Sequence, residues 1–200
     1  SAGKEITYTV KEVTKVAEYK TEAVTDAKTR ITTITNSYDV KKTAVEGTKT
    51  WVDNSDQDGK RPESITITLY ANGEVKETKT VTANDNWTWT FKDLDVYKNG
   101  TEIEYTIAED VVKGYTTKIN GFNVTNTHEI EKTEISGIKV WDDANNQDGK
   151  RPSEITVNLL ANGTKVDSKT VTADAEGKWS YEFKDLDKYA DGKLIEYTVR

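Results

Sequence analysis

The sequence predicts an all-β protein built from tandem β-sandwiches, on three observations. Threonine is abundant and proline occurs only twice in 200 residues, which favours half-buried strands over disorder. Short runs alternate apolar with polar side chains and are separated by turn-forming residues every 8–12 positions or so, as in a sandwich. A long motif also occurs twice, which indicates more than one domain of the same kind.

The repeated motif spans residues 47–62 and 137–152, where both copies place a lysine two positions before a tryptophan and end in Asp-Gly-Lys-Arg-Pro. The two copies are offset by 90 positions, and the offset becomes 92 from Trp87 and Trp179 onwards. A period of this length is too long for a solenoid and fits one domain per repeat.

The first 40 residues match the end of the repeat. Tyr8–Glu12 resembles Tyr105–Glu109, and Ile34–Tyr38 resembles Val124–His128. We therefore expect the chain to hold the C-terminal part of one repeat, one complete repeat and the N-terminal two-thirds of another. These are called the N-terminal segment (1–40), the central segment (41–130) and the C-terminal segment (131–200).

Alternating apolar positions predict the strands of the central segment in order. Asn72-Gly73 predicts a tight hairpin between the second and third strands. Lys92–Asp95 is predicted as a loop or at most one helical turn. The expected strands cover residues 44–53, 64–71, 74–82, 87–91, 103–107, 115–119 and 122–128.

Composition excludes several functions. The formal net charge of −7 argues against nucleic acid as a partner, because phosphates require a basic surface. No apolar run approaches the length of a membrane span, so no membrane insertion is expected in this segment. No signal peptide is visible, which indicates a mature or excised segment. Cysteine is absent, which excludes disulfides and thiolate metal sites.

The residues needed for turnover catalysis are also missing. His128 is the only histidine, so no Ser-His-Asp triad or histidine metal site can form within a repeat, and we interpret it as a solvated linker residue. Residues 54–59 begin like a calcium loop, but Ile65 occupies the twelfth position and Ala144 replaces the first ligand in the second copy. We interpret the loop as a polar turn and expect no metal or cofactor.

Lys49 is the residue whose role the pattern leaves open. If Val45, Gly47, Lys49 and Trp51 share one face of a strand, the lysine points into the core beside an aromatic ring. If Thr48 and Thr50 face inward instead, Lys49 faces solvent, which is the usual position of a lysine.

Several linked motifs resemble the B-type repeat of Gram-positive collagen adhesins, the Cna B-type domain. They are Lys-Val-Trp-Asp-Asp followed by Asn-Gln-Asp-Gly-Lys-Arg-Pro, then Leu-Leu-Ala-Asn-Gly, Phe-Lys-Asp-Leu-Asp-Lys-Tyr and Ile-Glu-Tyr-Thr-Val. The resemblance covers essentially the whole chain. It implies transthyretin-like, inverse immunoglobulin-like sandwiches strung as stalks of extracellular, cell-wall-anchored proteins, with the anchor outside this segment.

Many such domains form a spontaneous isopeptide bond, and the resemblance implies Lys49 and Asn126 as its partners with Glu109 as the assisting acid. Burial favours the neutral form of both ionisable groups, so an uncharged lysine could attack while a protonated glutamate polarises the amide. Glu104 is a competitor for the acid. Glu109 shares strand parity with Tyr105 and matches Glu12 of the N-terminal segment, so we favour it.

The end segments hold complementary parts of the same group. The C-terminal segment has Lys139 without a final strand, whereas the N-terminal segment has Glu12 and Asn36 without a lysine strand. Head-to-tail association, with Lys139 of one chain meeting Glu12 and Asn36 of another, is one expectation. Proteolysis or an excerpt from a longer array is the alternative.

The expected function is a structural stalk segment of a bacterial surface adhesin, with neighbouring repeats of the same protein as partners and isopeptide bonds that resist force and proteolysis. The alternative is a ligand-binding module that contacts host extracellular matrix or glycan. An enzyme is not expected, since a self-formed crosslink consumes its own residues in a single turnover.

Overall fold

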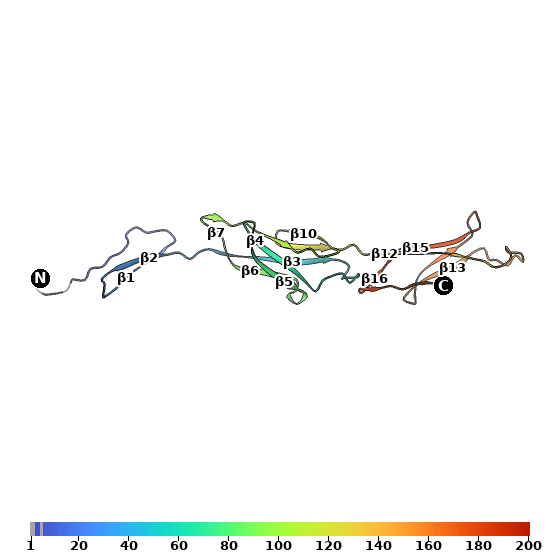
Figure 1. The fold of residues 1–200 in the computed structure, drawn as a ribbon, viewed down its shortest axis with the longest axis horizontal. Helices are drawn as coiled ribbons and strands as arrows, with labels where there is room; N and C mark the ends of the chain where they lie inside the picture. Colours follow the sequence, from blue (N-terminus) through green and yellow to red (C-terminus); the bar gives the residue numbers. More distant parts are fainter. Residues whose placement is uncertain (1–2, 5) are drawn as a thin grey trace. The chain divides into compact units, whose positions relative to one another are not determined.

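The regular structure of the protein is almost entirely β-strand in the computed structural model, which describes residues 3–4 and 6–200 (Figure 1). A 3₁₀ turn at Ala83–Asp85 follows the fifth strand. No helix among the described residues has the length and hydropathy needed to span a bilayer. The strands are β1 (Lys20–Thr25), β2 (Thr32–Ser37), β3 (Lys42–Val52), β4 (Ser64–Ala71), β5 (Glu74–Thr82), β6 (Thr88–Asp95), β7 (Tyr97–Lys98), β8 (Thr101–Glu102), β9 (Tyr105–Glu109), β10 (Thr116–Asn120), β11 (Asn123–Thr127), β12 (Lys132–Lys139), β13 (Ile155–Ala161), β14 (Thr164–Val171), β15 (Trp179–Asp187), β16 (Tyr189–Ala190), β17 (Lys193–Leu194) and β18 (Tyr197–Val199).

The chain divides into two compact units. One consists of the described residues up to Val45 together with Phe91–Glu104, and the other of Glu46–Thr90 together with Tyr105–Arg200. In the first unit, β1 and β2 form an antiparallel hairpin, as do β7 and β8. The predicted crosslink residues of the central segment, Lys49, Glu109 and Asn126, all lie in the second unit.

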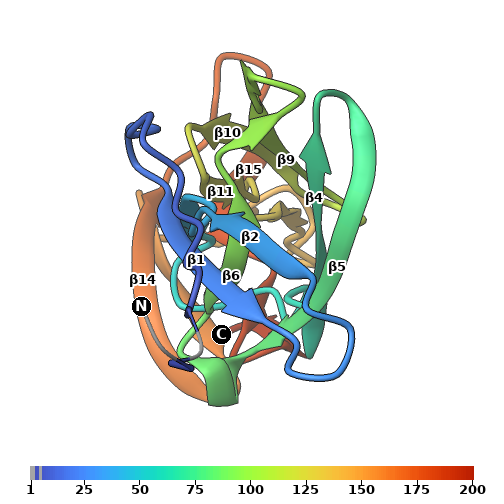
Figure 2. The ribbon, with the colours of Figure 1, turned by 90° about the vertical axis from the view of Figure 1, so that its left-hand side faces the viewer.

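Two sheets build the sandwich of the central segment. One has the strand order β10-β11-β3-β6, in which β11 runs parallel to β3 with Val124 opposite Lys49. The other has the order β5-β4-β9, in which both outer strands run antiparallel to β4. In Figure 2, β4, β5 and β9 lie on one side and β10 and β11 on the other. The predicted all-β sandwich is therefore confirmed.

The strand β4 shows why these residues form a half-buried sheet. Ile65, Ile67 and Leu69 are buried and alternate with more exposed threonines, because successive side chains of a strand point to opposite faces. The predicted hairpin after β4 is also present. Asn72 and Gly73 both have positive φ, as a two-residue turn between right-twisted strands requires.

The prediction for Lys92–Asp95 was wrong, because these residues continue strand β6 to Asp95. Asp93 has a φ of 56°, a left-handed conformation that interrupts the alternation and turns Leu94 into the core, where it is 2% exposed. The same irregularity recurs at Asp185 in β15. A break in alternation therefore marks an irregularity within the strand rather than its end.

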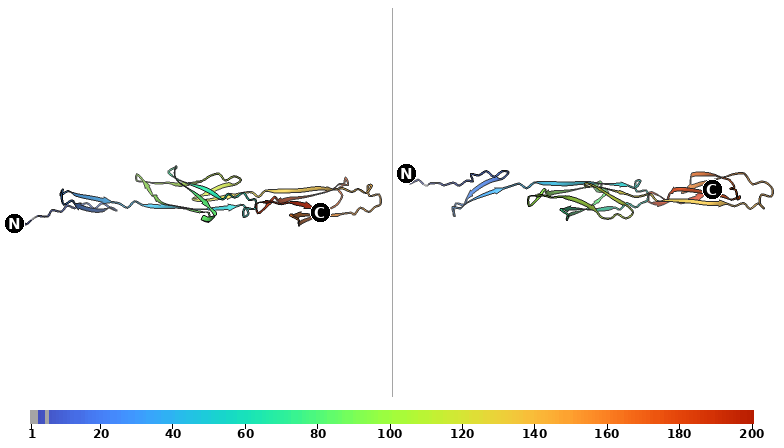
Figure 3. Two further views of the ribbon diagram at one scale, coloured as in Figure 1. Left: turned by 60° about the horizontal axis from the view of Figure 1, so that its bottom comes forward. Right: turned by 90° about the horizontal axis from the view of Figure 1, so that it is seen from above.

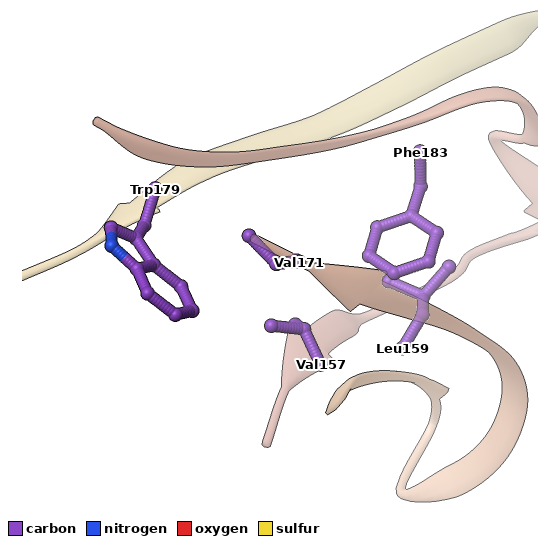
Figure 4. Close-up of a cluster of buried hydrophobic side chains, with 5 residues drawn as sticks. All are labelled: Val157, Leu159, Val171, Trp179 and Phe183. Atoms are coloured by element: carbon purple, nitrogen blue, oxygen red, sulfur yellow. The ribbon is translucent and has the colours of Figure 1, made fainter. Parts of the chain in front are cut away.

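The C-terminal segment forms its own strand group, drawn in yellow-orange to red in Figure 3. In this group β12 pairs with β15, and β13 lies between β14 and β18. Its hydrophobic core includes Trp179, which lies beside the valines of β13 and β14, and Phe183 beside Leu159 (Figure 4). The core cluster consists of Val157, Leu159, Val171, Trp179 and Phe183.

Residues 8–12 of the N-terminal segment have no strand structure, although they match β9 in sequence. In the central segment β9 pairs with β4, and the N-terminal segment contains no sequence equivalent to β4. An isolated strand without a pairing edge is unstable in water, which explains the difference.

Candidate functional site

Lys49 lies inside the central sandwich. In β3 the buried positions are Val45, Gly47 and Lys49, so the structure adopts the inward orientation of the two that the sequence left open. The lysine is 6% exposed, and its backbone N–H donates to the carbonyl oxygen of Trp87 at 2.7 Å. Strand alternation therefore holds an ammonium-bearing side chain in the core.

Glu109 reaches Lys49 from the opposite sheet. It is the last residue of β9, and its side chain forms an ion pair with the Lys49 ammonium in which both side chains are 0% exposed. The other carboxylate oxygen accepts a hydrogen bond from Thr117 Oγ1 at 3.1 Å. Glu104, the competing acid, is exposed and precedes β9. The arrangement therefore fixes one carboxylate against the lysine.

Asn126 is the third member of the group. It is 0% exposed in β11, and neither its Nδ2 nor its Oδ1 has a hydrogen-bond partner among the described residues. Its position follows from the parallel register, in which Val124 lies opposite Lys49 and Asn126 lies two residues further along the same face. A buried carboxamide without partners costs roughly 1–3 kcal/mol for each unsatisfied group, so this amide is an unfavourable core residue unless it reacts.

Burial changes the protonation of the lysine. Desolvation lowers the pKa of Lys49, and the hydrogen bond and charge of Glu109 only partly oppose it, so the pKa lies below the ordinary lysine value. The indole ring of Trp51 lies 4.5 Å from Lys49 Nζ and packs edge-on against Trp87 and Tyr115. The face of an indole ring favours a charged ammonium, so the lowered pKa of Lys49 comes from desolvation and not from the ring.

The polar turn after β3 is held by a second buried carboxylate. Asp53 accepts hydrogen bonds from Arg61 Nη2 at 2.6 Å, Arg61 Nε at 3.0 Å and the Tyr115 hydroxyl at 2.8 Å. Burial alone would raise the pKa of Asp53, but these donors lower it below the ordinary range. Asp56 in turn accepts the backbone N–H of Arg61 at 2.8 Å. These two carboxylates are thus engaged by protein donors.

The N-terminal segment brings Glu12 and Asn36 together. Asn36 Nδ2 donates to Glu12 Oε2 at 2.8 Å, and Thr21 Oγ1 donates to Asn36 Oδ1 at 2.5 Å. Lys139 is exposed in the C-terminal segment, with its ammonium 4.7 Å from the ring centre of Trp141. The N-terminal segment thus brings the acid Glu12 and the amide Asn36 together, while the C-terminal segment exposes the corresponding lysine, Lys139.

Thr117 is a residue that the sequence analysis missed. It lies opposite Asn126 in the β10–β11 pair, and Thr21 lies opposite Asn36 in the β1–β2 pair. Each hydroxyl bonds a member of its local acid–amide group, Glu109 in one case and Asn36 in the other. A threonine at matching hairpin positions in both segments was the available signal, but it is weak in a threonine-rich chain.

The interpretation of His128 as a solvated linker residue was wrong. Its side chain is 9% exposed and bonds the Gly114 carbonyl oxygen through Nδ1 at 2.7 Å and Asp58 Oδ2 through Nε2 at 2.8 Å. Desolvation lowers the pKa of His128, but these hydrogen bonds and the Asp58 charge raise it above the ordinary histidine value. The histidine therefore ties the end of β11 to the Asp-Gly turn.

Comparison with known proteins gives a consistent set of relatives. The sequence pattern of the Cna protein B-type domain matches residues 45–127 and 135–200. A collagen adhesin of Staphylococcus aureus is 44% identical over 98% of this chain, which spans 16% of that protein's length. The crystal structure of two B repeat units (B1B2) of the S. aureus collagen-binding protein Cna superposes with a TM-score of 0.60 and 42% identity, covering 100% of this chain and 53% of that one.

Proposed function

The chain belongs to the Cna protein B-type domain family, and from that premise we propose that it is a stalk segment of a bacterial surface adhesin, stiffened by self-formed Lys–Asn isopeptide bonds. The proposal includes the three segments: part of one repeat at 1–40, a complete repeat at 41–130 and part of another at 131–200. It also places the parent protein outside the cell and anchored to the wall. One observation carries it, which is the buried group of Lys49, Glu109 and Asn126 in the second unit.

The proposed reaction joins Lys49 Nζ to Asn126 Cγ. The uncharged amine attacks the carboxamide carbon while Glu109, in its protonated form, hydrogen-bonds the amide and polarises it. Glu109 delivers its own proton to Nδ2 and, as the resulting carboxylate, takes up the proton of the attacking nitrogen. The Cγ–Nδ2 bond breaks and ammonia leaves, so the amine and the primary amide become a secondary amide with no oxidant or cofactor required.

Three features of the group support this chemistry. Desolvation lowers the pKa of Lys49, which makes the nucleophile available. The fold supplies proximity, because β3 and β11 are paired neighbours and β9 faces them across the sandwich. The amide of Asn126 gives up no hydrogen bond to another described residue when it reacts.

The position of the bond suits a load-bearing domain. Tension along the chain would enter at the start of β3 and leave at the end of β11, and these parallel strands are hydrogen-bonded neighbours. A covalent link between them would carry the force past all residues in between. By analogy with disulfides, closing this 77-position loop stabilises the fold by about 4.5 kcal/mol.

The alternative, a module that binds host matrix or glycan, has weaker support. The polar group that distinguishes the domain is enclosed, since the side chains of Lys49 and Glu109 are 0% exposed and Asn126 is fully buried. Ligand sites are normally concave surfaces with accessible polar groups, so an enclosed group fits a reaction within the fold better.

Intact mass under denaturing conditions tests the crosslink directly. The chain is expected to be lighter than its sequence by one ammonia, and Lys49→Ala should have the full sequence mass after allowing for the substitution. Lys139→Ala is the matched control, because it removes the equivalent lysine of the C-terminal segment and should keep the deficit. An unmodified mass in the folded, aged chain would refute the proposal.

We propose in addition that separate chains associate head to tail, with Lys139 of one chain meeting Glu12 and Asn36 of another. The hydrogen bond between Glu12 and Asn36 and the exposed Lys139 support this pairing. Both end segments also expose large apolar side chains, among them Tyr8, Val10, Val24, Ile138 and Val140. Light scattering at several concentrations should show mass increasing with concentration, and a strict monomer at every concentration would refute it.

A further inference from the structure

The Asp-Gly turn of the central segment contacts a hairpin of the C-terminal segment, and the crosslink chemistry does not account for this contact. The backbone N–H of Gly192 donates to the carbonyl oxygen of Gln57 at 2.9 Å, and Gln57 Nε2 donates to the carbonyl oxygen of Tyr189 at 3.3 Å. Gly192 follows β16 in the turn that leads to β17. The two backbones are therefore hydrogen-bonded to each other.

The approach is so close that a side chain at Gly59 does not fit and one at Gly192 would be crowded. A Cβ added to Gly59 would lie 2.7 Å from Gly192 Cα, and a Cβ added to Gly192 would lie 3.2 Å from Gly59 Cα. The first distance is shorter than any real carbon contact, and the obstacle is backbone rather than a flexible side chain. Any side chain at Gly59 must therefore separate the turn from the hairpin.

Charged groups surround this backbone contact. Glu131 lies between two lysines, with Lys188 Nζ at 2.9 Å and Lys60 Nζ at 3.5 Å, and both ammonium groups lie 5.4 Å from the ring centre of Tyr189. The linker is fixed to the turn as well, since Asp58 Oδ2 accepts the backbone N–H of Glu131 at 2.8 Å. Ion pairs of this exposure contribute little energy individually but favour one arrangement of the groups.

The same two elements occur a second time without this contact. The turn at Gly149 has a φ of 64°, close to the 65° of Gly59, and the hairpin turn at Gly100 has a φ of 78°. No described atom lies within 4 Å of a Cβ built on either residue. The turn and the hairpin thus adopt their shapes on their own, so the contact between Gly59 and Gly192 is an additional interaction and not a requirement of local folding.

We propose that the turn Gln57–Lys60 and the hairpin Tyr189–Leu194 form a specific joint, through which one B-type domain recognises the next and movement about the linker 128–131 is restricted. The surface is the Asp-Gly-Lys turn, and its partner is a second domain of the same family that presents a Tyr-x-Asp-Gly hairpin. The joint does not depend on the Lys–Asn crosslink, so an experiment that refutes one of the two proposals does not refute the other.

Distance measurements between two spin labels in the whole chain test the joint. The chain has no cysteine, so Val75→Cys and Val166→Cys, at positions 65% and 55% exposed, give two unique labelling sites. The parent is expected to show a narrow distance distribution. Gly59→Asn should broaden it at least about twofold, because asparagine accepts positive φ but its Cβ does not fit.

Gly149→Asn is the matched control, with the same φ in the equivalent turn and free space around its Cβ. It should leave the distribution unchanged, as should Gly100→Asn. Gly192→Asn should broaden it less than Gly59→Asn, because its Cβ is crowded rather than excluded. The proposal would be overturned if the distance distribution had the same width in all variants. It would also be overturned if Gly59→Asn and its control Gly149→Asn broadened the distribution equally. If the Gly59 variant does not fold, Gln57→Ala should broaden the distribution and Gln147→Ala should not. Gln57→Ala removes the side-chain bond to Tyr189, together with the bond that Gln57 accepts from Asn54 within the turn.

Discussion

Glu109 and Lys49 meet across the central sandwich, each from a different sheet and each with a side chain that is 0% exposed. A buried ion pair is weak evidence for stability, because desolvation of both charges offsets most of their attraction. The nearby amide of Asn126 has no hydrogen-bond partner among the described residues, which adds to the cost. This cost is what the proposed crosslink would remove, because the reaction converts the amine and the amide into one bond.

Glu109→Gln is expected to slow the crosslink without disturbing the fold. The substitution keeps the shape of the side chain but removes a group that can exchange protons, and general acid–base catalysis contributes about 10²–10⁴-fold in rate. The loss of ammonia, followed by intact mass after refolding, should therefore be slower by that order. Glu104→Gln is the control, and a variant that crosslinks as fast as the parent would assign the acid elsewhere.

Thr117→Val should also slow the crosslink, but by less. Its hydroxyl donates to the Glu109 carboxylate oxygen that does not face the lysine, so it positions the acid without touching the reacting atoms. Loss of one such hydrogen bond is expected to cost about tenfold in rate. Thr117→Ser, which keeps the hydroxyl, should restore the rate, whereas a purely structural role would give equal rates for both variants at equal thermal stability.

The stability of the chain should depend on pH through His128. Its pKa is raised in the folded state, so it binds its proton more tightly there than in the unfolded chain. The stabilisation is fully present below the unfolded value of about 6.5 and is lost as pH rises through the folded value. The groups that face the ring are Asp58, Glu131, the Gly114 carbonyl and Tyr115.

Thermal unfolding between about pH 5 and pH 9 measures this dependence. The midpoint of the parent should fall relative to that of His128→Gln as the pH increases across this range. His128→Gln keeps a polar side chain but does not titrate, so its profile lacks the histidine contribution. Parallel profiles for the two proteins would show that the histidine does not contribute.

Two equivalent aspartates should differ in their effect on stability. Asp53 is 1% exposed at its side chain and bonds both Arg61 and Tyr115, whereas Asp143 is 29% exposed and bonds Arg151. Asp53→Ala leaves a partly buried guanidinium and a hydroxyl unpaired, which should cost about 3 kcal/mol in the central domain. Residue-resolved hydrogen exchange would report this loss in β4 and β11.

Asp143→Ala serves as the comparison, since solvent replaces much of what it removes. Protection in β13 should change far less than protection in β4 does in the Asp53 variant. Equal losses in the two domains would mean that the carboxylate stabilises the turn only through local hydrogen bonds, irrespective of its burial.

Much of the fold follows from local sequence. Alternation in β4 and the Asn72-Gly73 turn predict their strand and hairpin, because strand period and turn conformation are properties of neighbouring residues. The end of β6 was missed, since the alternation breaks at Asp93 and only the burial of Leu94 shows that the strand continues past it. Burial is decided by elements distant in the chain.

The sequence by itself determined the repeat, the strand pattern and, through the family resemblance, the residues to consider as crosslink partners. Only the tertiary structure decided that Lys49 points inward, that Glu109 meets it and that His128 is enclosed. The contact between Gly59 and Gly192 likewise required the packed chain, because both glycines already suit their turns. The period of a strand indicates which residues share a face. Contacts between sheets and between domains determine which of the two faces is buried.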